Sequence, residues 1–229
     1  MKTSTIINIF AEKVPEAIAW SRGEFYGPNG VDSEADIKKI LFCVTPTEAV
    51  IKYFKKNQYD LLISHHPFRV SVPQIILHTA LDCCEGGLND IWRDVVGVRD
   101  AKHFDGTLGW HGAIEPISFT ALVQKCEDFM GGKVRGQLYH KIETIRSVVI
   151  CTGLGGLVTT QARNTGADLY LTGELCSPAH SVGLPAVIET GHTLSERCGV
   201  DVIRRLLPDM RVDTAPLKID VFGSEYYRN

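Results

Sequence analysis

The chain has 229 residues, of which 44% are hydrophobic and 22% are charged, a composition typical of a soluble globular protein. Its 24 basic and 27 acidic side chains give a net charge of −3, which argues against nucleic acid as the main ligand because phosphate binding needs clustered lysine and arginine. No apolar run is long enough for a membrane span, and no signal-peptide stretch is present at the start, so we expect a cytoplasmic protein.

The first half of the chain predicts a strand, a helix and a second strand. Ile40–Val44 is a short apolar run typical of a buried strand. Thr45 is the predicted N-cap of a helix that has proline at its first position and should end near Asn57. Asp60–Ser64 is a second apolar run, which ends at two histidines.

The second half predicts the same order of elements. Val148–Thr152 is a strand, Gly153–Gly156 a turn, Leu157–Thr165 a helix and Ala167–Leu171 a strand. The glycines can form a simple tight turn or can offer backbone N–H groups to a phosphate, and the tight turn is favoured because the dinucleotide fingerprint lacks its third glycine.

The similar spacing of the two halves predicts an α/β fold of two similar α/β lobes, although two buried parallel strands can also resemble each other by chance. A helix capped by Ser118 should end at Gly131 and Gly132, which are typical C-terminal residues. We therefore divide the chain into a first lobe, 1–130, and a second lobe, 131–229. Open α/β sheets bind ligands beyond the carboxyl ends of their strands, which predicts a site where the lobes meet.

His65 and His66 form the first candidate for chemistry. Adjacent side chains of an extended segment point to opposite sides, so these two imidazoles can each reach a different metal ion. An isolated histidine pair can equally be a surface feature or part of a hydrogen-bonded loop.

Two further segments offer metal ligands. His192 and Glu196 are four positions apart, and therefore on one face of a predicted helix, although a helix-start histidine beside a solvated glutamate is the plain alternative. Asp82, four residues after His78, lies among apolar residues and needs a partner such as a cation if it is buried. These nitrogen and oxygen donors suit zinc, iron or manganese, and two such ions would make a bridging hydroxide available as a nucleophile.

Four segments resemble the signature blocks of a known family. In chain order they are LLISHHPF, HTALDCCEGGLND, GADLYLTGEL and ETGHTLSER. The family is named after the yeast Ngg-one-interacting factor three, and its bacterial members are often labelled GTP cyclohydrolase 1 type 2 homologues. The resemblance implies two divalent metal ions, toroidal hexamers built from dimers, and a ligand set in which Glu196 bridges the ions. These implied ligands are His65, His66, Asp82, His192 and Glu196.

The sequence departs from the family pattern at several positions. Trp20 begins a segment that differs from the usual Trp-Asp-Asn block, Cys43 replaces an aspartate, and Ala80 replaces an asparagine. His180 is a candidate for a histidine that the family places after Thr-Gly-Glu. Because these positions should lie near the site, we expect substrate choice to differ from that of relatives even where metal binding is retained.

We therefore predict a dinuclear-metal-dependent hydrolase that acts on a nucleotide-like or phosphorylated small molecule, with His78 or Glu174 carrying protons. The alternative is a non-catalytic metal-binding or regulatory adaptor that forms a ring-shaped oligomer. A third possibility is a ring that threads nucleic acid, which would show a steep loss of binding with salt. The sequence alone names no substrate, metal or protein partner.

Overall fold

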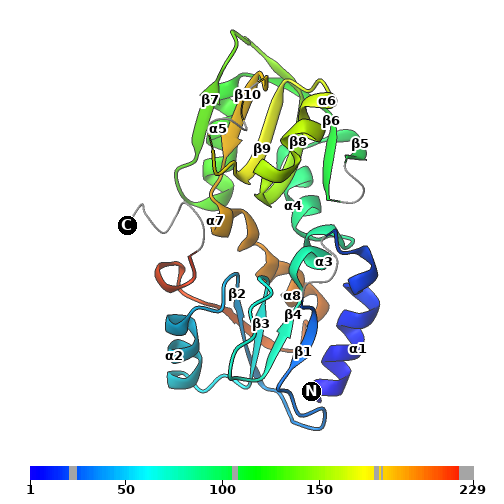
Figure 1. Cartoon of the computed structure of the whole chain (residues 1–229), viewed down its shortest axis with the longest axis vertical. Helices are drawn as coiled ribbons and strands as arrows, with labels where there is room; N and C mark the ends of the chain where they lie inside the picture. The colour runs from blue at the N-terminus through cyan, green and yellow to red at the C-terminus, as the bar shows by residue number, and fades with distance from the viewer. Residues whose placement is uncertain (21–24, 105–107, 178–180, 182, 222–229) are drawn as a thin grey trace. The chain divides into compact units, whose positions relative to one another are not determined.

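The structure is a computed structural model that describes residues 1–20, 25–104, 108–177, 181 and 183–221 (Figure 1). It divides into two compact units. Of the described residues, unit 1 comprises Met1–Gly87 and residues 197–221, and unit 2 comprises Leu88–Glu196. In the described part of the chain, no helix is long and apolar enough to cross a membrane.

Unit 1 contains a five-stranded sheet in the order β1-β4-β3-β2-β11. The four strands from β4 to β11 are parallel, and β1 runs antiparallel at the edge. The strands are β1 (Gly27–Asn29), β2 (Lys39–Cys43), β3 (Leu61–Ser64), β4 (Gln74–Ile76) and β11 (Arg211–Thr214). The α-helices are α1 (Thr3–Lys13), α2 (Glu48–Lys56), α3 (His78–Cys83) and α8 (Gly199–Leu206), and the 3-10 helices are η1 (Glu16–Ile18) and η4 (Leu217–Ile219).

Unit 2 contains a six-stranded sheet in the order β5-β6-β8-β9-β10-β7. The central strands β8, β9 and β10 are parallel, and the remaining pairs are antiparallel. The strands are β5 (Arg99–Phe104), β6 (Gly109–Ile117), β7 (Arg135–Leu138), β8 (Ile145–Leu154), β9 (Leu169–Glu174) and β10 (Ala186–Glu189). The helices are α4 (Leu88–Val96), α5 (Phe119–Met130), the 3-10 helix η2 (Gly155–Val158), α6 (Thr159–Asn164) and α7 (His192–Glu196).

The unit boundaries differ from the division predicted after residue 130. The predicted helix is present as α5, with Ser118 accepting a hydrogen bond at its start and Gly131 in the left-handed conformation at its end. However, α5 packs against α4 inside unit 2, so Gly131 ends a helix without ending a unit. The chain also returns to unit 1 after Glu196, which a single boundary does not describe.

The two predicted strand, helix and strand segments share their hydrogen-bonding plan. Ile40 pairs with Leu61, and Val148 pairs with Leu169, so the spacing between paired strands is the same in both. Asp60 accepts hydrogen bonds from the backbone N–H groups of Lys38 and Lys39. In the same way, Asp168 accepts from Arg146 and Ser147. The fold is thus α/β with two mixed sheets that share this core and differ in their outer strands.

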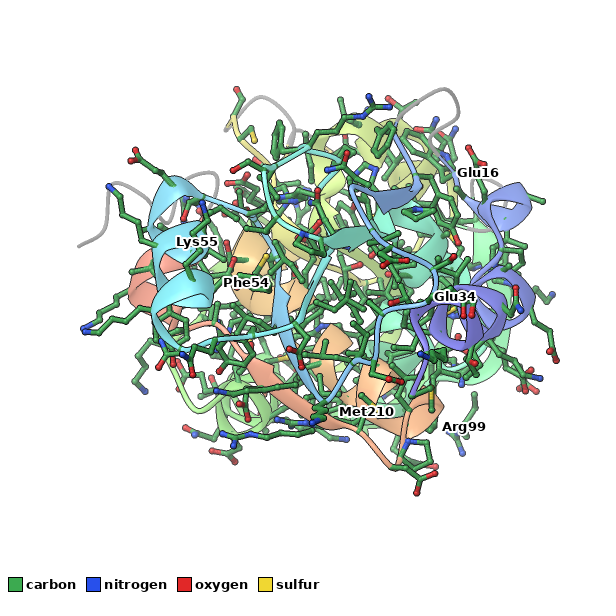
Figure 2. All side chains as sticks on the ribbon, turned by 90° about the horizontal axis from the view of Figure 1, so that it is seen from below. Glu16, Glu34, Phe54, Lys55, Arg99 and Met210 are labelled. Carbon is green, nitrogen blue, oxygen red and sulfur yellow. The ribbon has the colours of Figure 1, made fainter. Side chains whose placement is uncertain are left out.

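Helix α2 begins later than the sequence predicts. Thr47, and not Thr45, is its N-cap, because the Thr47 hydroxyl accepts a hydrogen bond from the backbone N–H of Val50 at 3.1 Å. The amphipathic pattern of this helix is present: Phe54 is buried and Lys55 is exposed, and both are labelled in Figure 2. Thr45 is therefore available for a different contact, with a histidine side chain.

Candidate metal centre

His65 and His66 directly follow β3, as the sequence predicts. Their backbone N–H groups donate to the carbonyls of Cys43 and Val44, which extends the parallel pairing of β3 with β2. Both side chains are buried, although both are polar. Their ring centroids lie 5.3 Å apart. Because both imidazoles are buried at the carboxyl edge of a parallel sheet, the histidine pair is not a surface feature.

Helix α3 adds a carboxylate and a third imidazole to this cluster. Asp82 is buried, and its Oδ2 lies 3.8 Å from His65 Nε2. The ring of His78, which is half-buried, lies 5.3 Å from the ring of His65 and 6.1 Å from that of His66. A buried carboxylate needs a charged or hydrogen-bonding partner, and a cation held by the neighbouring imidazoles provides one.

The second cluster lies in unit 2, on β9 and α7. His192 Nδ1 lies 2.8 Å from Glu174 Oε1, and His192 Nε2 lies 3.3 Å from Glu196 Oε1. All three side chains are buried. Burial lowers the pKa of His192, but the charge of Glu196 and the hydrogen bond to Glu174 outweigh it and raise the pKa to about 10. An ion bound at Nε2 therefore has to displace a proton from this imidazole.

Helix α7 is short, and three hydrogen bonds fix it. The Ser195 hydroxyl donates to the carbonyl of His192 at 2.7 Å and accepts from the backbone N–H of Gly153 at 3.0 Å. The indole N–H of Trp92 donates to the Ser195 carbonyl at 2.9 Å. Trp92 is fully buried and comes from α4, so the core of unit 2 determines where His192 and Glu196 lie.

Gly153 lies against the second cluster. It has a φ of +62°, and a Cβ at this position would lie 2.2 Å from Glu196 Oε1 and 3.4 Å from His192 Nε2. Only glycine allows the backbone to come this close to the glutamate carboxylate. The predicted turn at Gly153–Gly156 is instead the end of β8, which includes Gly153, followed by the 3-10 helix η2, which begins at Gly155.

We expect Gly153→Ala to lower both stability and metal affinity. Alanine in the left-handed conformation costs about 1–2 kcal/mol, and the new methyl group would also push Glu196 away from its place. Gly166→Ala is the matched control, because Gly166 has a φ of +70° and nothing within 4 Å of an added Cβ. Urea unfolding and zinc content after dialysis measure the two effects. Equal losses of stability with full zinc content in both variants would contradict the steric role of Gly153.

The donors of the two clusters fit a divalent transition-metal ion. Each cluster offers buried imidazole nitrogens and carboxylate oxygens, which are donors of the type that could hold an ion. Imidazole nitrogens with carboxylate oxygens suit zinc, iron or manganese rather than a site built of thiolates. Because Gly153 has no side chain, there is space beside it for the carboxylate of Glu196.

Within each unit, the structure brings several of the predicted residues together in one cluster. Unit 1 brings together His65, His66, Asp82 and His78, and unit 2 brings together His192, Glu196 and Glu174. His180 lies outside the described residues. Sequence reasoning missed the positioning role of four residues, although one of them, Ser195, lies in the ETGHTLSER segment. They are Thr45, Trp92, Ser195 and Asp220.

Comparisons with known proteins show the family and agree with this fold. The family model described as Duf34/NIF3 (NGG1p interacting factor 3) matches residues 1–76 and 69–229. The chain belongs to this family. The resemblance noted from the four sequence segments is therefore confirmed.

Relatives of similar length cover nearly the whole chain. The GTP cyclohydrolase 1 type 2 homolog of Clostridium perfringens is 26% identical over 86% of this chain and 87% of its own. That of Methanothermobacter thermautotrophicus is 23% identical over 99% and 97%. Among solved structures, reduced HcgD from Methanocaldococcus jannaschii has a TM-score of 0.84 at 22% identity, covering 95% of this chain and 98% of its own. A Bacillus cereus protein related to NIF3 has a TM-score of 0.79 at 14% identity, with 97% and 99% covered.

Proposed function

We propose that the two clusters together hold two divalent ions and that the chain is a metal-dependent hydrolase. The observation that carries this proposal is the burial of imidazoles and carboxylates in each unit, with orienting partners for His66 and His192. When bound, the ions would act as Lewis acids and lower the pKa of a water molecule toward neutrality. The proposed ligands are His65, His66, Asp82, His192 and Glu196.

Two neighbouring side chains, Glu174 and His78, have different roles in the proposed site. Glu174 accepts the Nδ1 hydrogen of His192, which leaves Nε2 for an ion, so we assign Glu174 an orienting role. His78 is half-buried and close to both His65 and His66, and it is the better candidate to carry a proton to or from the substrate.

Features beside His66 support a planar, anionic substrate. Phe68 is 48% exposed, and its ring meets the ring of His66 edge-on at 6.2 Å. The guanidinium of Arg69, three residues after His66 in sequence, lies over the ring of Phe25 at 3.4 Å. An aromatic ring against a proposed ligand and a guanidinium, which can bind phosphate, suit a nucleotide-like or phosphorylated molecule, and the name of the curated relatives supports the same class.

A substrate panel tests this proposal. We expect protein loaded with zinc, iron or manganese to hydrolyse at least one member of a panel of nucleotides and phosphoesters, and Asp82→Ala and Glu196→Ala to abolish that turnover because each removes an ion ligand. Arg69→Gln should raise KM for phosphorylated substrates and leave the bound metal unchanged, since Arg69 contacts no proposed ligand among the contacts described.

The same assay also tests the alternative hypothesis of a non-catalytic adaptor. Full metal occupancy without turnover of any substrate would favour a non-catalytic metal-binding protein. Failure to bind any divalent ion would overturn both hypotheses. The hexamer and the cytoplasmic location stay predictions.

A further inference from the structure

A buried carboxylate from the end of the described chain binds the loop that follows β2. Asp220 is fully buried. Its Oδ2 accepts from the backbone N–H of Val44 at 3.0 Å, and its Oδ1 accepts from that of Thr45 at 2.7 Å. Arg197 Nη1 lies 3.6 Å from Asp220 Oδ2. Burial of a charged carboxylate is costly unless it is hydrogen-bonded and paired, and here it is both.

The loop that Asp220 binds makes contact with a proposed metal ligand. The Thr45 hydroxyl lies 2.8 Å from His66 Nδ1, and both side chains are buried. The backbone N–H of His66 also donates to the Val44 carbonyl at 2.8 Å. Both the backbone and the ring of His66 are therefore held by the two residues whose amides bind Asp220.

We propose that Asp220 and Thr45 are positioning residues that fix the ring of His66 for metal binding. Thr45 accepts the Nδ1 hydrogen, so that Nε2 carries the lone pair that binds an ion. Asp220 holds Thr45 at that place through its two backbone hydrogen bonds. This inference rests on the proposed role of His66 as a ligand and extends it to Asp220, which lies 176 positions after Val44 and outside the family signature segments.

The first experiment replaces the threonine hydroxyl. We expect Thr45→Val to weaken zinc affinity by about 10–100-fold, the usual effect of losing an outer partner of a ligating histidine. Thr45→Ser keeps the hydroxyl and should keep the affinity of the natural chain. Zinc competition with a chelating dye gives the affinities, and nitrogen-15 NMR of the metal-free protein reports which nitrogen of His66 carries the proton. We expect that proton on Nδ1 in the natural chain and in Thr45→Ser, and a changed distribution in Thr45→Val.

The second experiment tests Asp220 against a matched control. Asp60 accepts hydrogen bonds from two successive backbone N–H groups, those of Lys38 and Lys39, both at 2.9 Å, at the opposite end of β2. We expect Asp220→Asn to weaken zinc binding and to change the His66 spectrum, and Asp60→Asn to change neither, although both lower thermal stability.

Three outcomes decide the inference. Natural zinc affinity and an unchanged His66 tautomer in Thr45→Val would overturn it, and so would equal zinc affinities of Asp220→Asn and Asp60→Asn. If Asp220→Asn does not fold, the Thr45 pair still gives the answer. Failure of the natural chain to bind zinc or any other divalent ion would instead overturn the proposed function.

Discussion

His65→Ala and His192→Ala are each expected to remove most of the bound metal, although the two residues belong to different units of the chain. The proposed centre shares its ions between the clusters, so loss of either imidazole leaves the remaining ligands too few to hold an ion. The loss of affinity should exceed the ~10–100-fold that follows removal of an outer partner of a ligand. Elemental analysis after dialysis and zinc competition measure it.

A control histidine and the metal stoichiometry make this result specific. His140→Ala should leave the metal content unchanged, because His140 is exposed and belongs to neither cluster. If each unit held its own ion, His65→Ala would remove one ion and leave the affinity of the other intact. That pattern would contradict a shared centre.

Trp92→Ala is expected to lower the free energy of unfolding by about 3–5 kcal/mol, the usual cost of removing a large buried aromatic side chain. Trp92 is fully buried, its ring packs edge-on against Phe129 at 5.0 Å, and its indole N–H holds the carbonyl of Ser195. Urea unfolding monitored by circular dichroism measures the change. Because Ser195 lies between His192 and Glu196 in α7, the variant should also lose metal affinity.

Two further variants separate packing from hydrogen bonding at this position. Trp92→Phe keeps much of the apolar contact but loses the N–H donor. Its loss of stability should therefore be smaller than that of Trp92→Ala, whereas its metal affinity should still fall. Trp20→Ala makes the same change at a residue that is 37% exposed, where the loss of stability should be much smaller. A Trp92→Ala protein as stable as Trp20→Ala would show that the α4 core does not support the site.

The central elements of the fold could be predicted because their sequence signals are local. Ile40–Val44 is apolar throughout and Val148–Thr152 is apolar up to Cys151, as expected for strands buried on both faces of a parallel sheet. Helix α4 was missed, although Leu88, Trp92 and Val96 recur at four-residue spacing and are all buried. The edge strand β5 is mostly exposed and has no apolar run, so nothing in its local sequence indicates a strand.

The candidate ligands were found because each lies in a short segment with a recognisable spacing. Their supporting residues were not found, since their partners are distant in sequence. Thr45 resembles a helix cap when only its neighbours are considered, and its contacts with His66 and Asp220 exist only in the folded chain. The family resemblance identified metal-binding side chains, whereas the contacts that orient them had to come from the structure.

Unit 1 is formed by two separate stretches of the chain, which affects how it folds during translation. Residues leave the ribosome in order from the amino end, and domains generally form as units when their residues are available. The sheet of unit 2 needs no strand after Glu189, whereas β2 gains its neighbour β11 only when Arg211–Thr214 has been made. The edge of β2 therefore stays unpaired until β11 has been made. An unpaired strand edge can pair with another chain, which promotes aggregation.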